Sequence, residues 1–360
     1  MKLIRVLIAD DSSLARGLLR NFLESEAGME VVGEAVNGRQ AVELCRQLKP
    51  DLITMDLEMP VMSGLQAIEE IMCSKAVPIL VVSSVADAQN ALAAVGCGAL
   101  EVVSKPDYTP EQAAEFVAKV RMLAGVSVIT RMRPRPLPEV AMAPAALAIA
   151  PILPRREGTM ANSGKDYSRI FVIASSTGGP QALALILPAL PADFPCPVLV
   201  AQHISDGFAG GMVEWLSSLC QLPVRLASEG ELLQAGVIYI SPSERHFSVT
   251  AGRRVALLER APSDIYRPSC DTLLHSVAEV FGRQAVGIIL TGMGRDGAKG
   301  MAHMHAKGGA TLGQDEATSV IFGMNSVAIE AGAVQRILPV EAIAAEIIRL
   351  ADPFLLGAKG

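Results

Sequence analysis

The sequence predicts an α/β protein with two domains. Its 360 residues exceed the roughly 250 to 300 residues at which a single hydrophobic core usually stops growing, so two cores are expected. Apolar residues make up 51% of the chain and aromatic residues only 4%. Val, Ile, Leu and Ala must therefore build the interior, as buried parallel strands and their covering helices require.

Five short apolar runs in the first 123 residues alternate with helical patterns and predict a doubly wound, five-stranded parallel sheet. The runs are 3–9, 30–35, 52–56, 78–83 and 101–103. After the first run, Ser12 or Ser13 can cap a helix. Apolar residues recur in this helix at four-residue spacing, at Leu14, Leu18 and Phe22. A similar stripe predicts the next helix, with Ala41, Leu44, Cys45 and Leu48.

A linker and a second α/β domain follow. Residues 124–167 hold six prolines among Ala, Arg and Met without stable periodicity, which predicts a flexible linker. Strand-like runs then resume at 169–175, 198–202, 237–240 and 286–290. The predicted domains are therefore 1–123 and 168–355, the second an α/β sandwich with a mainly parallel sheet.

Composition excludes several classes of protein. The formal net charge of −6 and the lack of a dense basic run disfavour nucleic-acid binding. The six cysteines are scattered without metal-site or disulfide spacing, and they are expected to be buried thiols in a reducing compartment. The longest apolar stretch, 140–153, is interrupted by Pro144 and Pro151, so no membrane insertion is expected. These features predict a cytoplasmic protein.

Acidic residues gather at the carboxyl ends of the first domain's strands, where open α/β sheets bind ligands. The residues at these strand ends are Asp10, Asp11, Asp56, Ser83 and Lys105. Three converging carboxylates repel one another unless a cation such as Mg²⁺ lies between them. Taken singly, each could be a solvated loop residue. Together they suit phosphoryl transfer to a carboxylate.

The segments around these residues resemble the receiver domains of bacterial response regulators over about 120 residues. The matching segments are Asp10-Asp11-Ser12, Met55-Asp56-Leu57-Glu58-Met59-Pro60-Val61-Met62-Ser63-Gly64, Ser83-Ser84 and Ser104-Lys105-Pro106. The resemblance implies that Asp56 is the phosphorylated residue, with Ser83 and Lys105 contacting the phosphoryl group. It also implies a Mg²⁺ site formed by Asp10, Asp11, Asp56 and the backbone carbonyl of Glu58. Val102 stands where many receivers have an aromatic switch residue, so signal transmission here should depend less on ring rotation.

A nucleophile turn is predicted in the second domain, where an apolar strand runs into Ser175-Ser176-Thr177-Gly178-Gly179-Pro180. Centred on Ser176, the segment reads A-x-S-x-G, a relaxed nucleophile elbow with small flanking residues. Centred on Ser175, it would place Ile173 and Thr177 at the small positions, so Ser176 is preferred. The alternative is a phosphate-binding or purely structural glycine-rich turn.

Two further strand ends supply partners for this serine. His203 follows the run 198–202, and Asp296 follows the run 286–290. A hydroxyl nucleophile needs a base, and the base needs a carboxylate to fix its tautomer. The order Ser, His, Asp along the chain differs from that of ordinary α/β-hydrolases, which indicates a distinct fold. Asp271 and His275, one helical turn apart, are the rival catalytic pair.

A dinucleotide site is a second rival in this region. The segment from Gly292 to Gly297 fits G-x-G-x-x-G, with Asp315 and Glu316 some 18 residues later. In such a site Asp296 would bring a negative charge close to the pyrophosphate. We therefore expect no cofactor in the second domain.

The second-domain motifs resemble the chemotaxis protein-glutamate methylesterase family, and with the first domain the resemblance covers both domains. The motifs are Ser175-Ser176-Thr177-Gly178-Gly179-Pro180, Gln202-His203-Ile204, Tyr266-Arg267-Pro268-Ser269, Thr291-Gly292-Met293-Gly294-Arg295-Asp296-Gly297 and Gln314-Asp315-Glu316. The resemblance implies a nucleophile at Ser176, a base at His203, an orienting acid at Asp296, and backbone oxyanion donors near Thr177 and Met293. Ser175 and Asn325 depart from the family pattern without removing a catalytic group.

The family implies hydrolysis of glutamyl methyl esters on chemoreceptors, often with deamidation of glutamines, under the control of receiver phosphorylation. Its partners would be the methylated cytoplasmic helices of chemoreceptors and a histidine kinase as phosphodonor. The unphosphorylated receiver is expected to cover the catalytic edge. Two alternatives are the same enzyme on another pathway, and a phosphorylation-switched binding module with an inactive hydrolase domain. The complete set Ser176, His203 and Asp296 disfavours the second alternative.

Overall fold

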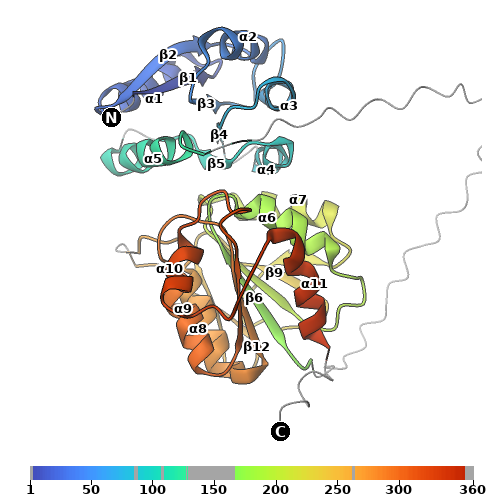
Figure 1. Ribbon diagram of the computed structural model, residues 1–360. Helices are drawn as coiled ribbons and strands as arrows, with labels where there is room; N and C mark the ends of the chain where they lie inside the picture. Colours follow the sequence, from blue (N-terminus) through green and yellow to red (C-terminus); the bar gives the residue numbers. More distant parts are fainter. Residues whose placement is uncertain are drawn as a thin grey trace, which may run out of the picture.

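The computed structural model contains two α/β domains, which Figure 1 shows one above the other. It describes residues 3–84, 88–106, 109–126, 128, 167–261 and 264–352. Most of the predicted linker, 124–167, lies outside the described residues, so the linker and the domain bounds remain predictions.

The N-terminal domain is built on a parallel sheet in the order β2-β1-β3-β4-β5. Its strands are β1 (Ile4–Ala9), β2 (Met29–Ala35), β3 (Leu52–Met55), β4 (Ile79–Ser83) and β5 (Glu101–Ser104). The predicted five-stranded, doubly wound fold is confirmed. All residues of β3 and β4 are buried, and apart from Thr54 and Ser83 their sequences are apolar, as expected for strands covered on both faces.

Four helices connect these strands and a fifth follows β5: α1 (Ser13–Glu24), α2 (Gly38–Leu48), α3 (Gly64–Ser74), α4 (Ala88–Cys97) and then α5 (Pro110–Leu123). Ser12 caps α1 by accepting a hydrogen bond from the Ala15 amide. The predicted apolar stripe of α1 is only partly right, because Phe22 packs against the core but the fully buried residues lie one position later. Leu19 and Leu23 are buried, whereas Leu14 is 69% exposed. Two parallel stripes run along this helix, and spacing alone did not identify the one that faces the sheet.

The C-terminal domain has a seven-stranded parallel sheet in the order β14-β13-β12-β6-β7-β9-β8. Its strands are β6 (Ile170–Ser175), β7 (Val198–Gln202), β8 (Val224–Leu226), β9 (Ile238–Ile240), β12 (Ala285–Ile289), β13 (Ala310–Gln314) and β14 (Arg336–Leu338). Four of these were predicted, and the parallel α/β class is confirmed. An antiparallel pair, β10 (His246–Val249) and β11 (Val255–Leu258), lies apart from the sheet and was not predicted.

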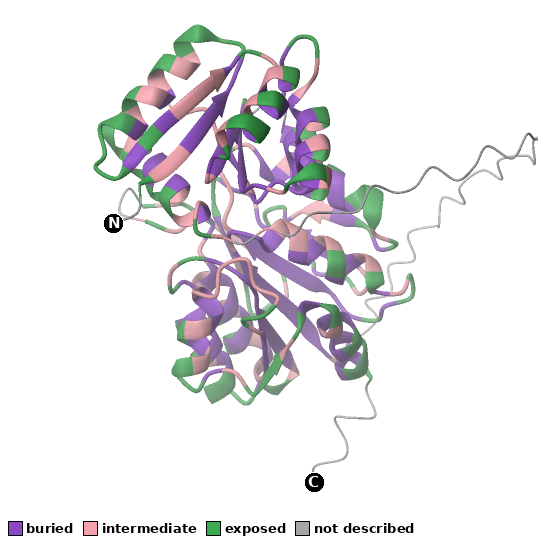
Figure 2. Cartoon of the chain, turned by 45° about the horizontal axis from the view of Figure 1, so that its top comes forward, coloured by how far each residue is buried: buried purple, intermediate pink, exposed green. Residues whose placement is uncertain are grey.

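Helices cover both faces of this sheet (Figure 1). One face carries α8 (Cys270–Phe281), α9 (Ala298–Ala306) and α10 (Met324–Glu330), and the other carries α6 (Gly179–Ile186), α7 (Ala209–Leu219) and α11 (Val340–Ala351). Two short 3-10 turns, η2 (Leu187–Ala189) and η3 (Gly282–Gln284), complete the domain. Figure 2 shows the sheet as the buried layer between helices with exposed outer faces.

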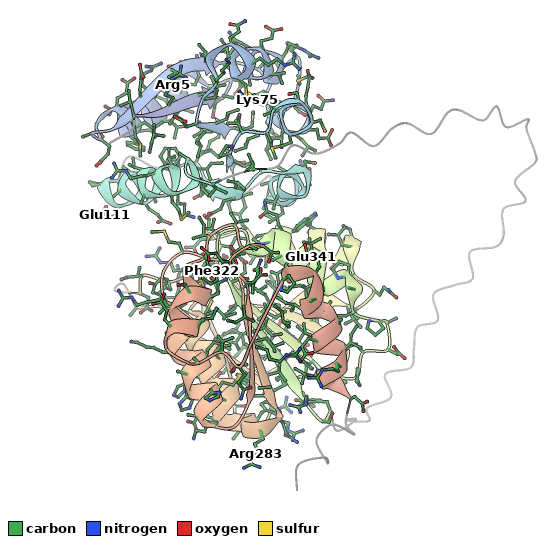
Figure 3. All side chains as sticks on the ribbon, in the orientation of Figure 1. Arg5, Lys75, Glu111, Arg283, Phe322 and Glu341 are labelled. Carbon is green, nitrogen blue, oxygen red and sulfur yellow. The ribbon has the colours of Figure 1, made fainter. Side chains whose placement is uncertain are left out.

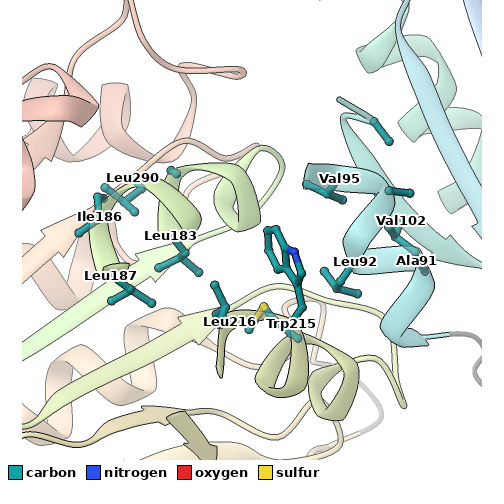
Figure 4. Close-up of a cluster of buried hydrophobic side chains, with 14 of the residues drawn as sticks. Ala91, Leu92, Val95, Val102, Leu183, Ile186, Leu187, Trp215, Leu216 and Leu290 are labelled. Carbon is teal, nitrogen blue, oxygen red and sulfur yellow. The ribbon is translucent and has the colours of Figure 1, made fainter. Parts of the chain in front are cut away.

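The two domains contact each other through α4 of the first and α6 and α7 of the second. Trp215 of α7 is 9% exposed and faces α4, beside Leu92 and Val95 (Figure 4). A Cβ built on Gly96 of α4 would lie 3.5 Å from the Trp215 ring, so the indole packs directly on the helix backbone. Buried apolar residues of both domains thus form one continuous cluster.

Two expectations from composition can be compared with the described residues. Cys45, Cys196 and Cys270 are buried free thiols as expected, but Cys73, Cys97 and Cys220 are only partly buried. Burial raises the pKa of the Cys220 thiol to about 11. Among the helices in the described part of the chain, none is long and apolar enough to cross a membrane.

Candidate active site

Three neighbouring strands bring the predicted catalytic residues to one edge of the second sheet. The order β12-β6-β7 places the carboxyl ends of these parallel strands side by side. Ser176 directly follows β6, His203 directly follows β7, and Asp296 lies in the loop after β12. Figure 3 shows this edge, at the level of Phe322, facing the first domain.

His203 and Asp296 form a close pair. The Nε2 atom of His203 lies 2.7 Å from Oδ2 of Asp296, which is 2% exposed. The backbone amides of Cys270, Asp271 and Gly297 donate to the same carboxylate at 2.6, 2.9 and 3.1 Å. Burial opposes ionisation of Asp296, but the hydrogen bond and charge of His203 and these amides outweigh it and hold its pKa below the usual value. The carboxylate is therefore kept charged and fixed.

Two other side chains, in addition to Asp296, contact the imidazole of His203. The ring of Tyr266 stacks on it with centroids 5.3 Å apart and planes 15° apart. The thiol of Cys270 lies 3.5 Å from Nε2. Because Nε2 is engaged with Asp296, Nδ1 is the ring nitrogen left to accept a proton from a nucleophile.

The two serines of the turn have different surroundings. Ser175 is fully buried, and its hydroxyl donates to Oε1 of Gln202 at 2.6 Å. Ser176 is half-buried and lines a cavity together with His203. Within the described residues no hydrogen bond joins the Ser176 hydroxyl to His203, so the nucleophile contact would have to form when substrate binds. Of the two serines, Ser176 is therefore the one that lines the cavity, while Ser175 is fully buried.

Glycines make the sharp turn after β6 possible. Gly178 has φ +78, in the left-handed region that side chains rarely adopt. A Cβ built on Gly179 would lie 2.0 Å from the Gln202 amide oxygen, so any side chain there would displace Gln202. A Cβ on Gly292 would lie 2.6 Å from Cβ of Ser176, which explains why this loop approaches the serine so closely.

The predicted oxyanion donors lie in the same cavity. Thr177 and Met293 both line it, and Met293 is 53% exposed. In the described part of the chain, neither backbone amide donates to a protein acceptor, while the Thr177 carbonyl accepts from the Thr291 hydroxyl at 2.9 Å. Two unengaged amides beside a serine are suitable donors to a developing oxyanion.

The structure gives the rival residues other contacts. Asp271 accepts the Gly300 amide at 2.7 Å, and His275 stacks on His303 with ring centroids 4.0 Å apart. The supposed dinucleotide fingerprint contains Asp296, whose carboxylate is bound to His203. These contacts support neither the Asp271/His275 catalytic pair nor the dinucleotide site.

Asn325 and Ser175, the two departures from the family pattern, are both accommodated by hydrogen bonds. Asn325 is fully buried and donates to the Gln314 carbonyl at 3.0 Å and to the Ser319 hydroxyl at 2.8 Å. It ties the end of β13 to the following loop. Ser175 contacts Gln202, which also donates to the Ser176 carbonyl at 2.8 Å.

The first domain brings its predicted acidic residues together. Asp10, Asp11 and Asp56 have carboxylate oxygens within 4.8 Å of one another. Nζ of Lys105 lies 2.9 Å from Asp10 and 3.0 Å from Asp56. Glu58, two residues beyond Asp56, is exposed.

This pocket fits a hard cation and a phosphoryl group. Oγ of Ser83 is buried without a hydrogen-bond partner in the described residues, while the buried Oδ2 of Asp10 pairs with Nζ of Lys105. Burial raises the pKa of Asp56, and the charge of Asp10 adds to this while Lys105 opposes it. Burial would lower the pKa of Lys105, but Asp10 and Asp56 outweigh burial and raise it. Clustered carboxylates that are costly to ionise suit Mg²⁺.

A cavity of about 690 Å³ separates the first domain from the catalytic edge. Its lining includes Ser176, Thr177, His203 and Met293 from one domain, and Glu101 and Lys119 from the other. The Thr177 hydroxyl donates to Glu101 at 2.6 Å, and Nζ of Lys119 lies 2.5 Å from the same carboxylate. The Gln181 amide donates to the Ala99 carbonyl at 2.5 Å.

Sequence reasoning named Tyr266 only as part of a family motif and gave it no role. It gave His246 no role either, although this residue is buried and its Nε2 lies 2.9 Å from Oδ2 of Asp264. The contacts of these two residues cannot be inferred from sequence spacing. Tyr266 lies 63 residues from His203 and His246 lies 18 residues from Asp264, so only the fold brings each pair together.

Comparisons with known proteins show what each domain is similar to. Residues 171–347 match the family model of the CheB methylesterase, and residues 6–117 match that of the response regulator receiver domain. A Paramagnetospirillum magneticum protein named protein-glutamate methylesterase/protein-glutamine glutaminase 3 is 56% identical, covering 96% of each chain. An Anaeromyxobacter dehalogenans protein of the same name, numbered 2, is 42% identical and covers 94% of this chain and 95% of its own. The crystal structure of the Thermotoga maritima CheB methylesterase catalytic domain is 37% identical, with a TM-score of 0.49, and covers 51% of this chain and 98% of its own.

Proposed function

The chain belongs to the CheB methylesterase family, and from this premise we propose that it hydrolyses glutamyl methyl esters on chemoreceptors by a Ser-His-Asp mechanism controlled by receiver phosphorylation. The observation that carries the proposal is the His203–Asp296 pair at 2.7 Å, which lies beside the strand end bearing Ser176 in one cavity. Deamidation of receptor glutamines is the second reaction that this site would support, as the names of the relatives suggest.

In the first half of the reaction, Oγ of Ser176 attacks the ester carbonyl while Nδ1 of His203 takes its proton. Asp296 orients the ring through Nε2 and stabilises the imidazolium. The amides of Thr177 and Met293 stabilise the oxyanion of the tetrahedral intermediate. The bond to methanol then breaks, and His203 protonates the leaving oxygen.

In the second half, water hydrolyses the acyl-enzyme. His203 accepts a proton from this water, which attacks the acyl carbonyl, and the proton returns to Oγ of Ser176 as the bond breaks. The receptor glutamate is released with a free carboxylate. With a glutamine substrate the same steps release ammonia in place of methanol.

In the receiver, Asp56 would accept the phosphoryl group, and Asp10, Asp11, Asp56 and the Glu58 carbonyl would hold Mg²⁺. Held there, Mg²⁺ would supply positive charge near the transferring phosphoryl group. The Ser83 hydroxyl, which has no hydrogen-bond partner among the residues that the structure describes, and Nζ of Lys105 are suited to bind its oxygens. A histidine kinase or a small phosphodonor would supply the group.

The contacts between the domains support control by occlusion. In this arrangement β5 and α5 lie over the cavity that contains Ser176, which leaves little room for a receptor helix of about 10 Å diameter. Phosphorylation would favour a more open arrangement and so raise activity.

The test is methanol release from methylated receptor by the full chain, with and without Mg²⁺ and a phosphodonor. We expect release that increases on phosphorylation and that is lost in His203→Gln. Wild-type protein that phosphorylates normally but releases no methanol would contradict the proposal and favour a binding module.

A further inference from the structure

His246 is a buried histidine whose two ring nitrogens are both engaged. It begins β10 and is 7% exposed. Its Nδ1 atom accepts a hydrogen bond from the Ser269 amide at 2.9 Å, and its Nε2 atom lies 2.9 Å from Oδ2 of Asp264. Because Nδ1 accepts an N–H, the proton of the neutral ring must be on Nε2, which donates it to Asp264.

These two partners are the ends of one loop, residues 264–269. The Asp264 carboxylate also accepts the Ala261 amide at 2.7 Å. Inside the loop, the Arg267 carbonyl accepts the amide of Ile204, the residue after His203, at 3.2 Å. His246 therefore fixes both ends of a segment whose middle is bonded to the chain at the catalytic histidine.

The loop contacts both members of the catalytic pair. Tyr266, between the two fixed ends, stacks on the His203 ring. Ser269 caps α8, and its hydroxyl lies 3.3 Å from Oδ1 of Asp296. The next two amides of the chain donate to the same Asp296 carboxylate. His246 thus holds a segment that contacts both catalytic groups. Tyr266 packs on the ring face of His203, and the start of α8 donates hydrogen bonds to the carboxylate oxygens of Asp296.

We propose that His246 is a positioning residue for the hydrolysis: it fixes loop 264–269 so that Tyr266 and the first amides of α8 keep His203 and Asp296 in their reactive orientation. The inference rests on the proposed function. A buried, satisfied histidine is often only structural. Here, however, its hydrogen bonds end on a segment that contacts both catalytic groups.

The experiment uses the full chain, phosphorylated with a small phosphodonor and Mg²⁺, and measures kcat and KM for methanol release. His246→Leu removes both hydrogen bonds. His246→Asn keeps an acceptor near Nδ1 for Ser269, and His246→Gln keeps a donor near Nε2 for Asp264. His305→Asn, on the exposed surface of α9, is the matched control. Thermal melts verify that each variant is folded.

We expect His246→Leu to lower kcat by roughly 10- to 100-fold with KM changed by less than about threefold, because small displacements of catalytic groups cost this much. The Asn and Gln variants should each recover part of kcat, and His305→Asn should match wild type. In a double variant with Tyr266→Leu, the loss in kcat should be smaller than the product of the single losses, since both act on His203.

Folded His246 variants with wild-type kcat would overturn the inference. It would also be overturned if the loss in kcat of the double variant equalled the product of the losses caused by His246→Leu and Tyr266→Leu alone. If His246→Leu does not fold, the Asn and Gln variants decide, because wild-type kcat in both would equally overturn it. An inactive wild-type protein would instead count against the proposed function.

Discussion

Truncating Trp215 should raise the activity of the unphosphorylated enzyme. Its indole is 9% exposed, faces Leu92 and Val95 of α4, and lies against the backbone of Gly96. Trp→Ala changes at buried sites cost about 3 to 5 kcal/mol. Part of this burial comes from its own domain, so we assign roughly half, about 2 kcal/mol, to the contact with α4. The closed arrangement would then be disfavoured by about 30-fold.

The assay is methanol release by full-length Trp215→Ala without phosphodonor. Basal activity should rise by up to about 30-fold, limited by the activity of phosphorylated wild type, and the remaining stimulation by phosphodonor should shrink. Glu214→Ala, an exposed neighbour on the same helix, is the control and should behave as wild type.

A folded Trp215→Ala enzyme with unchanged basal activity would refute occlusion through this interface. Lower basal activity with intact phosphorylation would show instead that the receiver activates the catalytic domain by contact.

Three further predictions concern the two sites and their coupling. Deleting residues 1 to about 160 should raise activity above that of the unphosphorylated full-length protein, and a folded fragment that is no faster would point to activation by the receiver. Labelling by a small phosphodonor should require Mg²⁺ and disappear in Asp56→Asn, so label that persists in excess chelator would contradict the receiver site. Asp296→Asn should lower kcat by roughly 10⁴-fold. Because the folded-state pKa of Asp296 is lowered, its charge stabilises the protein above the usual aspartate pKa, and this contribution is lost as the pH falls through the lowered value. Asp296→Asn should therefore flatten the loss of thermal stability in acid, and an unchanged acid limb would contradict this.

The parallel sheets could be predicted because their central strands are buried on both faces and their sequences are mostly apolar. The edge strands could not. Both β8 and β14 have only three residues, and Arg336 and Ile337 of β14 are exposed, so their sequences carry no such run. The register of α1 was also missed, because Leu14 and Leu19 belong to adjacent stripes that only the packing distinguishes.

The rule that ligands bind at strand ends brought Ser176, His203 and Asp296 together from sequence alone. It could not identify Tyr266 or His246, because a loop and a separate hairpin supply them and no sequence period links these to the sheet. The contact between Thr177 and Glu101 also could not be predicted, because it joins two domains and no sequence pattern shows how domains pack.

Hydrolysis at Ser176 is the central claim, and comparing Ser176→Ala with Ser175→Ala in the methanol-release assay tests it most directly. Ser176→Ala should remain folded and lose at least roughly 10³-fold in rate, as when a triad member is removed. Ser175→Ala should retain activity, with only the loss expected from breaking its hydrogen bond to Gln202. An inactive Ser175→Ala enzyme together with an active Ser176→Ala enzyme would contradict the assignment.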